Sequence, residues 1–147
     1  MPYASSVGND SVAARLPVAE FAFPGPLRDR LVDAILRGDK VSTTSLAAQY
    51  GRGEPMPEPG QRFAVVDSVG RRVAVIEVTD VAVVALGVVD LAHCIDEGEG
   101  YTSVGEWREA HEAFWRGEDT RAELGENAAA LDDATPVVLE RFRLVTS

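Results

Sequence analysis

A chain of 147 residues with 46% hydrophobic and 26% charged residues is long enough to form one globular domain with a sizeable core. Its net charge is −10, and eleven carboxylates stand against three arginines between residues 90 and 126. Such a surface repels a phosphate backbone, which excludes DNA as a partner and disfavours RNA. One cysteine excludes an intrachain disulfide, and neither a secretion signal nor a membrane span is predicted. We therefore expect a cytoplasmic protein without membrane partners.

The first third of the chain predicts one helix followed by a strand. Residues 1–20 are small and polar, which is typical of a flexible tail, so the folded domain is expected at residues 21–147. Helical spacing of apolar residues predicts a helix that Gly38 ends, with the apolar positions at Leu27, Leu31, Ala34 and Ile35. Lys40 then lies at the entry to a strand. Because side chains alternate in a strand, Lys40 and Thr43 can cooperate only if the backbone near Val41 is irregular.

The remaining elements alternate irregularly. A Gly- and Pro-rich loop over residues 50–61 precedes strands at 63–66 and 73–78, and residues 81–89 continue the sheet. Asp90 caps a short helix, and Ser103 with Glu106 forms a capping box that opens a longer one. Residues 116–133 form an acidic connection without assigned structure, and residues 136–145 form a closing strand. This order predicts an α+β fold, a small curled sheet or barrel with flanking helices, and not a doubly wound sheet.

Lys40 is the first candidate for chemistry. It is the single lysine beside 13 arginines, and hydroxyl residues follow it at Ser42, Thr43 and Thr44. A lysine can lose its proton in a protein, whereas an arginine cannot, so a lysine beside hydroxyl groups is typical of acyl-transfer sites. The alternative interpretation is a lysine that has no special role.

The turn Glu97-Gly98-Glu99-Gly100 is the second candidate. Its two carboxylates could orient a lysine, act as acid and base, or hold a hard cation, while a solvated acidic turn is the ordinary interpretation of the spacing. Aromatic side chains follow, among them Tyr101, Trp107, His111 and Phe114. Helical spacing favours a core role for them, and the alternative is a surface on which the base of a nucleotide or nucleoside stacks. His93, His111 and Cys94 lack the spacing of a zinc site, and Cys94 is expected to be buried.

These motifs together resemble a known family. Gly38, Lys40 and Thr43 match the Gly-x-Lys-x-x-Thr signature of the ASCH-domain superfamily, which is placed after a first helix as it is here. The Glu-Gly-Glu-Gly turn followed by Trp107 and His111 is similar to the longer bacterial branch, in which such a turn precedes a Trp-x-x-x-His helix. The resemblance covers roughly residues 20 to 145 and implies a PUA-like β-barrel of about five to six strands.

The resemblance also implies an activity. One short bacterial branch is an amidohydrolase that removes the acetyl group of N4-acetylcytidine with a lysine, a threonine and a glutamate. Lys40, Thr43 and Glu99 match these three positions, and Glu97 competes with Glu99. Other branches are described as a ribonuclease and as RNA-interaction modules. The short hydrolases carry an arginine where this chain has Ser45, and they lack the added segment at residues 116–133.

Our leading hypothesis is a small hydrolase that cleaves an amide of a modified nucleoside or related metabolite. Lys40 deprotonates or positions Thr43, and Glu99 orients Lys40 and relays a proton. The expected binding residues are Ser42, Thr44, Glu97, Tyr101, Trp107 and His111. No metal or other cofactor is expected, and the protein is a monomer or a homodimer. The alternatives are an RNA-binding or ribonuclease module that uses the same cleft, and a non-catalytic sensor of a nucleoside-like small molecule.

Overall fold

The computed structural model describes residues 14–50, 54–125 and 130–146. Its centre is one five-stranded sheet with the strand order β1-β3-β4-β5-β2. The strands are β1 (Val18–Ala19), β2 (Ser42–Leu46), β3 (Arg62–Val66), β4 (Arg72–Ala85) and β5 (Pro136–Thr146). The helices in the described residues are α2 (Pro26–Arg37), α3 (Leu91–Asp96), α4 (Val104–Trp115) and α5 (Glu118–Leu124), with short 3-10 turns η1 (Ala47–Gln49) and η2 (Leu86–Val88). The predicted α+β class is confirmed.

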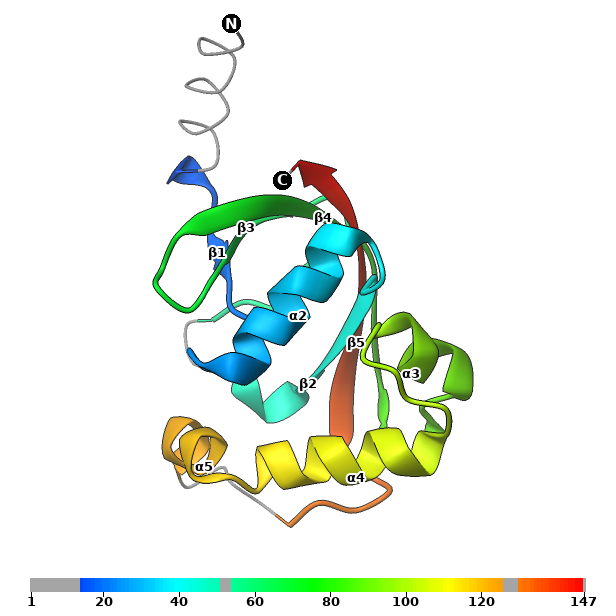
Figure 1. Cartoon of the computed structure of the whole chain (residues 1–147). Coiled ribbons are helices and arrows are strands. Elements are labelled where there is room, and N and C mark those ends of the chain that lie inside the picture. The colour runs from blue at the N-terminus through cyan, green and yellow to red at the C-terminus, as the bar shows by residue number, and fades with distance from the viewer. Residues whose placement is uncertain (1–13, 51–53, 126–129, 147) are drawn as a thin grey trace, which may run out of the picture.

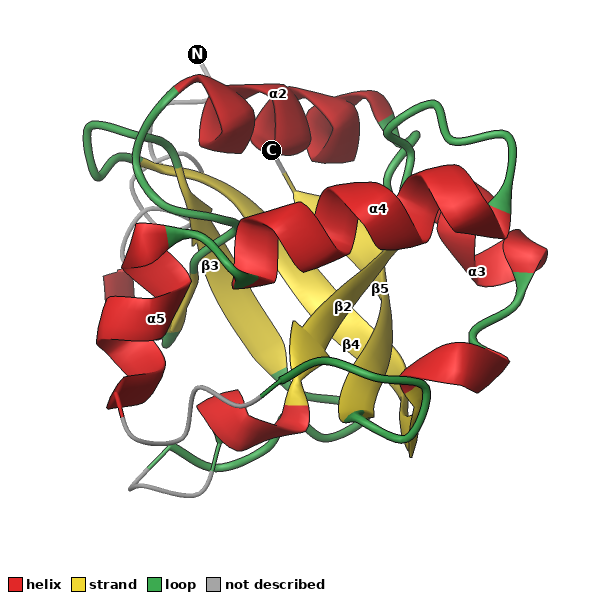
Figure 2. Cartoon of the chain, turned by 90° about the horizontal axis from the view of Figure 1, so that it is seen from below, coloured by secondary structure: helices red, strands yellow, loops and turns green. Residues whose placement is uncertain are grey.

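The sheet is strongly curled, as Figure 2 shows from below. The long strands β4 and β5 form its antiparallel centre, and the register shifts twice along β4, near Val75 and again between Val78 and Asp80. Such bulges bend a strand and increase its twist, which wraps the sheet around the helices. Within the described pairings the sheet does not close, because β1 and β2 remain at its two edges.

The N-terminal tail begins the fold earlier than expected. Val18 and Ala19 form β1 and pair in parallel with β3, so the prediction of a tail up to residue 20 is wrong at these positions. Two residues carry too little periodicity to be recognised as a strand from sequence. Residues 1–13 of the expected tail lie outside the described part of the chain.

Helix α2 lies across one face of the sheet and encloses the first of two hydrophobic cores (Figure 1). Pro26 opens the helix, where its missing N–H costs nothing, and Gly38 ends it in the left-handed conformation with φ +84°, as predicted. The first core joins this helix to the sheet through Phe21, Leu31, Val32, Ile35, Val65, Ala74, Ile76 and Phe142.

A second core lies under α3 and α4, at the other end of the sheet. Its centre is Trp107, which is fully buried, together with Cys94, which is also fully buried as expected. The connection at residues 116–133 contains α5, which the sequence did not predict because its seven residues offer few apolar positions. Thr120 anchors this helix by donating a hydrogen bond to the Phe114 carbonyl (3.1 Å). No helix in the described ranges is long and apolar enough to cross a membrane.

Candidate functional site

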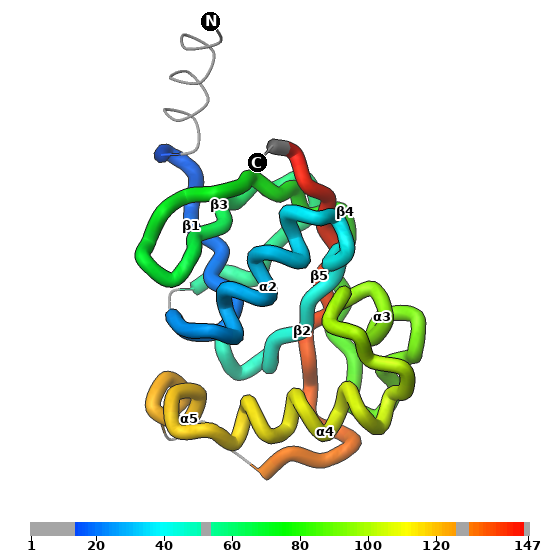
Figure 3. Tube along the Cα trace, in the orientation of Figure 1, coloured from blue at the N-terminus to red at the C-terminus, as the bar shows by residue number. Residues whose placement is uncertain are grey.

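The site lies between the two cores, where the segment after α2 meets the turn after α3 (Figure 3). Helix α2 ends at Gly38, and the amides of Asp39 and Lys40 both donate to the Ala34 carbonyl. The Val41 amide then donates to the Asp96 carbonyl (2.9 Å) on the other segment. Strand β2 starts only at Ser42, so the backbone at Val41 is irregular, as the proposed cooperation of Lys40 with Thr43 requires.

Gly98 makes the contact between the two segments possible. Its φ is +71°, and a Cβ atom there would lie 2.5 Å from the Asp39 carbonyl oxygen and 2.6 Å from the Lys40 nitrogen. These neighbours are backbone atoms, which cannot move aside without shifting the lysine. The glycine of this turn therefore sets how close the glutamates come to Lys40.

We expect Gly98→Ala to be the more damaging of two matched substitutions. Gly100 also has a positive φ of +90°, but a Cβ there would meet nothing within 4 Å. Gly100→Ala therefore carries the conformational strain alone, and Gly98→Ala adds a clash that should cost about 1–3 kcal/mol more in unfolding free energy. Urea denaturation of the two variants measures this difference. Equal stabilities would contradict the close contact.

Lys40 is 2% exposed and its ammonium faces oxygen atoms. Nζ donates to the Ser42 carbonyl at 2.8 Å and to the Glu97 carbonyl at 3.3 Å. Two carboxylates are also near, with Glu97 Oε1 at 3.8 Å and Glu99 Oε2 at 3.7 Å. Acceptors on several sides suit a charged ammonium, and burial makes its attraction to the carboxylates stronger than it would be in water.

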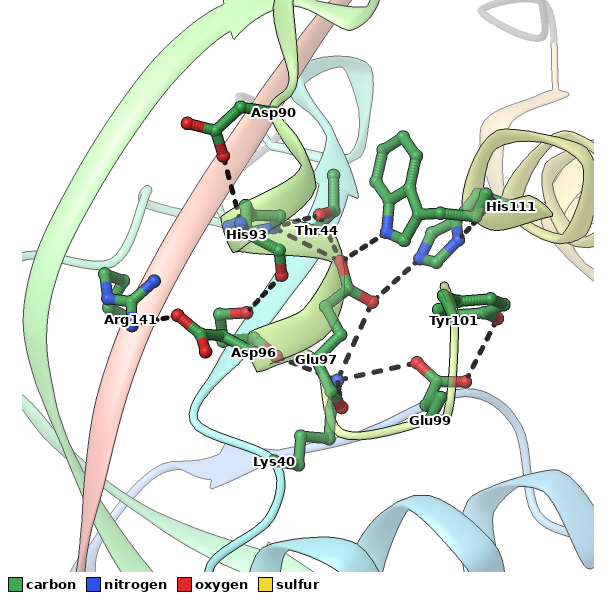
Figure 4. Close-up of polar contacts among 12 residues, drawn as sticks. Lys40, Thr44, Asp90, His93, Asp96, Glu97, Glu99, Tyr101, His111 and Arg141 are labelled. Carbon is green, nitrogen blue, oxygen red and sulfur yellow. Dashed lines mark hydrogen bonds and ion pairs between the residues drawn. The ribbon is translucent and has the colours of Figure 1, made fainter. Parts of the chain in front are cut away.

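Glu97 is the centre of a buried cluster (Figure 4). Its side chain is 1% exposed, so the interpretation of the turn as a solvated acidic loop is wrong for this residue. Its Oε2 accepts from the Thr44 hydroxyl (2.6 Å) and from the Trp107 indole (2.9 Å). Its Oε1 lies 3.0 Å from His111 Nε2. We name the set comprising Lys40, Thr44, His93, Glu97, Trp107 and His111 the Glu97 cluster.

Two histidines complete the Glu97 cluster. His93 Nε2 lies 2.7 Å from the Thr44 hydroxyl and 3.2 Å from Glu97 Oε2. His111 faces the Trp107 carbonyl with Nδ1 (2.9 Å) and Glu97 with Nε2, so both ring nitrogens meet acceptors. No residue pattern singled out His93, because one partner, Thr44, lies 49 residues away on β2 and the other, Glu97, lies four residues on, at the end of its own helix.

The surroundings of Glu97 and Glu99 shift the pKa values of the two carboxyl groups in opposite directions. Burial alone would raise the pKa of Glu97, but hydrogen bonds from His111 and His93 and the charge of Lys40 outweigh it and hold the pKa well below its usual range. For Glu99, burial dominates over the attraction of Lys40, and the charge of Glu97 adds to it, so the pKa is raised. Glu97 is thus held as an anion, whereas the surroundings of Glu99 shift its pKa toward the neutral acid.

A cavity of about 950 Å³ opens beside these residues. Lys40, Thr43, Glu99, Tyr101 and His111 all line it. In the described part of the chain, the Thr43 hydroxyl has no hydrogen-bond partner and is free to meet a ligand. The Tyr101 hydroxyl donates to Glu99 Oε1 at 3.4 Å, and burial raises the pKa of this tyrosine, which keeps it a donor.

Two predicted binding residues are not available to a ligand. Ser42 is fully buried and donates to the His93 carbonyl (3.1 Å), and Trp107 is fully buried under α4. Both predictions of direct contact are corrected: sequence spacing does not show which face of β2 or α4 turns inward. Thr44 lines the cavity, but its hydroxyl donates a hydrogen bond to Glu97, so it supports the Glu97 cluster. Ser45 pairs with the Tyr50 hydroxyl (3.0 Å) at the position where the short hydrolases have an arginine.

Sequence reasoning missed Glu140 on β5. This residue lies directly opposite Thr43 in the β2–β5 register, is 8% exposed and lines the same cavity. The only signal would have been the single acidic residue of the closing strand, which also carries Arg141 and Arg143, and register cannot be derived from that.

The cluster also contains side chains of the kind that bind metal ions. Glu97, Glu99 and His111 each present a ligand atom within 4.8 Å of the others. The ammonium of Lys40, however, already lies 3.7–3.8 Å from both carboxylates, and a second cation there would be repelled. The arrangement therefore suits the lysine as the counterion of the two glutamates.

Comparison with solved structures supports the fold. The chain is similar to an ASCH domain from Lactobacillus crispatus, with 28% identity, a TM-score of 0.74, and coverage of 93% of this chain and 86% of that one. A protein from Enterococcus faecalis V583 has 23% identity and a TM-score of 0.70 over 89% of this chain and 81% of its own, which shows a shared fold. No match was found among curated proteins.

The curled sheet, the helix across it and the cleft between them define a PUA-like α+β domain. The family model for the ASCH domain matches residues 20–146. The chain therefore belongs to the ASCH domain family, as its two motifs indicated.

Proposed function

We propose that this protein is a hydrolase that cleaves the amide of an N-acylated nucleoside or a closely related metabolite. The observation that carries the proposal is the free Thr43 hydroxyl in a cavity shared with a buried Lys40 and a glutamate of raised pKa. A nucleophile, a group that can exchange a proton and a fixed positive charge are the parts that acyl transfer needs. The cavity volume is in the range that holds a small molecule.

The proposed reaction has two steps. In the first, Thr43 Oγ attacks the acyl carbon while Glu99 takes the hydroxyl proton; the C–N bond then breaks, and the leaving nitrogen receives that proton. In the second, water attacks the threonyl ester with Glu99 as base, which releases the carboxylic acid and restores Thr43. Lys40 positions Glu99 and stabilises the negative charge that develops on the acyl oxygen. Glu97 holds Lys40 in place and does not itself move a proton.

A screen of the purified protein against acylated nucleosides, with N4-acetylcytidine as the first compound, tests this proposal. Thr43→Val removes the hydroxyl and keeps the shape, so we expect turnover to fall by about 10²–10⁴, whereas Thr43→Ser keeps measurable activity. Thr79→Val is the matched control, because Thr79 is an exposed strand residue on β4. Thr43→Val activity equal to that of the control would exclude Thr43 as the nucleophile.

The competing function is an RNA-binding or ribonuclease module, and salt dependence separates it from the hydrolase. We expect single-stranded RNA to bind no more tightly than about 10⁻⁴ M at physiological salt, because the chain carries −10 and the cavity is lined by several glutamates. Fluorescence anisotropy over a salt series measures this. Sub-micromolar binding that weakens steeply with salt would favour the RNA module instead.

A further inference from the structure

Glu140 is a buried acid that the proposed reaction does not use. It is 8% exposed, lines the cavity, and in the described residues forms no hydrogen bond or ion pair. No fully buried side-chain nitrogen or oxygen in the described residues lacks a hydrogen-bond partner, so the unpartnered carboxyl oxygens of Glu140 open onto the cavity, where a ligand can meet them.

Its position is fixed by the sheet. Thr43 and Glu140 are directly opposite in the antiparallel β2–β5 pair, so their side chains leave the same face of the sheet. Directly opposite residues have Cβ atoms roughly 4.5–5.5 Å apart. A ligand whose acyl carbon meets Thr43 therefore places the neighbouring part of the molecule against Glu140.

The surroundings of Glu140 favour its neutral form. Burial raises the pKa of Glu140 to about 7, although Lys40 opposes this shift. The other charged or titratable side chains that line the cavity are Glu20, Arg30, Asp33, Arg37, Lys40, Tyr50, Glu54, Glu97, Glu99, Tyr101, His111 and Glu123. A neutral carboxylic acid has one O–H donor and one carbonyl acceptor side by side, whereas a carboxylate can only accept.

We propose that Glu140 is the substrate-recognition residue of this cleft, and that as a neutral acid it binds the edge formed by a ring nitrogen and the adjacent amide N–H of an N-acylated aminopyrimidine. This inference rests on the proposed function and narrows its substrate class. The acid O–H donates to the ring nitrogen, and the acid carbonyl accepts from the amide N–H. An N-acylated aliphatic amine has no ring nitrogen and would leave the O–H of Glu140 unpaired.

Two substitutions of Glu140, compared with the wild type, test its role in substrate recognition. Glu140→Gln keeps a donor and an acceptor at every pH, and Glu140→Leu keeps the approximate size but neither group. We expect Glu140→Leu to lower kcat/KM for N4-acetylcytidine about 10- to 100-fold, chiefly through KM, and Glu140→Gln to stay within about tenfold of the wild type. Both variants remove a buried acid, so loss of folding is not expected to mask the result.

The substrate supplies the second half of the test. A 3-deaza analogue of N4-acetylcytidine has carbon in place of the ring nitrogen, so it loses the acceptor alone. The wild type should prefer the natural ring about 10- to 100-fold, and Glu140→Leu should lose this preference. If Glu140→Leu keeps the wild-type preference, the proposal is overturned, even though the hydrolase activity stands.

The pH dependence gives an independent readout. The neutral acid predominates below about pH 7, so wild-type kcat/KM should fall as pH rises above that value, by about tenfold per unit. Glu140→Gln should lack this decrease. An identical alkaline decrease in both proteins would assign it to another group and overturn the recognition role.

Binding of cytidine separates this inference from the proposed function. Cytidine presents the same ring nitrogen and N–H but has no amide to cleave. Calorimetry should detect cytidine binding that weakens about 10- to 100-fold in Glu140→Leu. If no acylated nucleoside is hydrolysed but cytidine binds in this way, the hydrolase fails and the recognition role stands. If cytidine binds equally to both proteins, the recognition role fails.

Discussion

Replacing Lys40 by methionine is expected to lower kcat/KM for an acylated nucleoside by about 10²–10⁴. The substitution keeps most of the side-chain volume but removes the charge that faces Glu97 and Glu99. Lys40→Arg should be similarly inactive, because a residue that is 2% exposed leaves no room for the wider guanidinium group. Initial rates under subsaturating substrate measure the effect.

Arg37→Met is the matched control for Lys40→Met. Arg37 is the last residue of α2 and its side chain is 53% exposed, so it loses a charge of the same sign only three residues away. Its activity should stay close to that of the wild type. Thermal melts of each variant show whether any loss of rate reflects unfolding. A folded Lys40→Met protein with wild-type activity would refute the role of Lys40.

Replacing Glu97 by alanine is expected to give the largest loss of stability, about 3–5 kcal/mol in unfolding free energy. The substitution leaves the buried Lys40 without its most buried counterion and removes the acceptor of the Thr44 hydroxyl and the Trp107 indole. Removing one partner of a buried charged cluster costs more than the whole cluster contributes, because the remaining groups stay desolvated.

Glu77→Ala is the matched control for Glu97→Ala. Glu77 is also a glutamate with two basic partners, Arg62 at 2.9 Å and Arg143 at 3.4 Å, but these lie on the exposed face of the sheet. Solvent screens such pairs, so its loss should be much smaller. Urea denaturation compares the two. Similar stabilities would show that the Glu97 cluster is not a structural anchor.

The sequence predicted those elements whose signal is local. Helix α2, with its apolar spacing and Gly38, and helix α4, opened by Ser103, follow from residues within one or two turns of each other. The pairing of Lys40 with the glutamate turn followed from the family resemblance and not from spacing alone. The structure adds how they meet: Gly98 lets the two backbones touch.

The features that sequence did not predict depend on long-range register. Glu140 enters the cavity only because β5 pairs with β2 in one register, and a shift by one residue would turn its side chain to the opposite face. His93 meets Thr44 across 49 residues of chain. Helix α5 is short and polar, so its burial is decided by packing, through Thr120 and Leu124, and not by its own periodicity.

The strand order also constrains when the cleft can form during synthesis. Strand β2, which carries Thr43, has β5 as its neighbour in the sheet, and β5 ends at Thr146. A ribosome must therefore translate β5, residues 136–146, before β2 finds its partner, whereas the β3–β4 hairpin can form much earlier. Nascent chains stalled before Pro136 should form the hairpin but leave β2 without its partner, and Lys40 exposed to solvent and to acylating reagents. Lys40 thus becomes protected only when the last strand is in place.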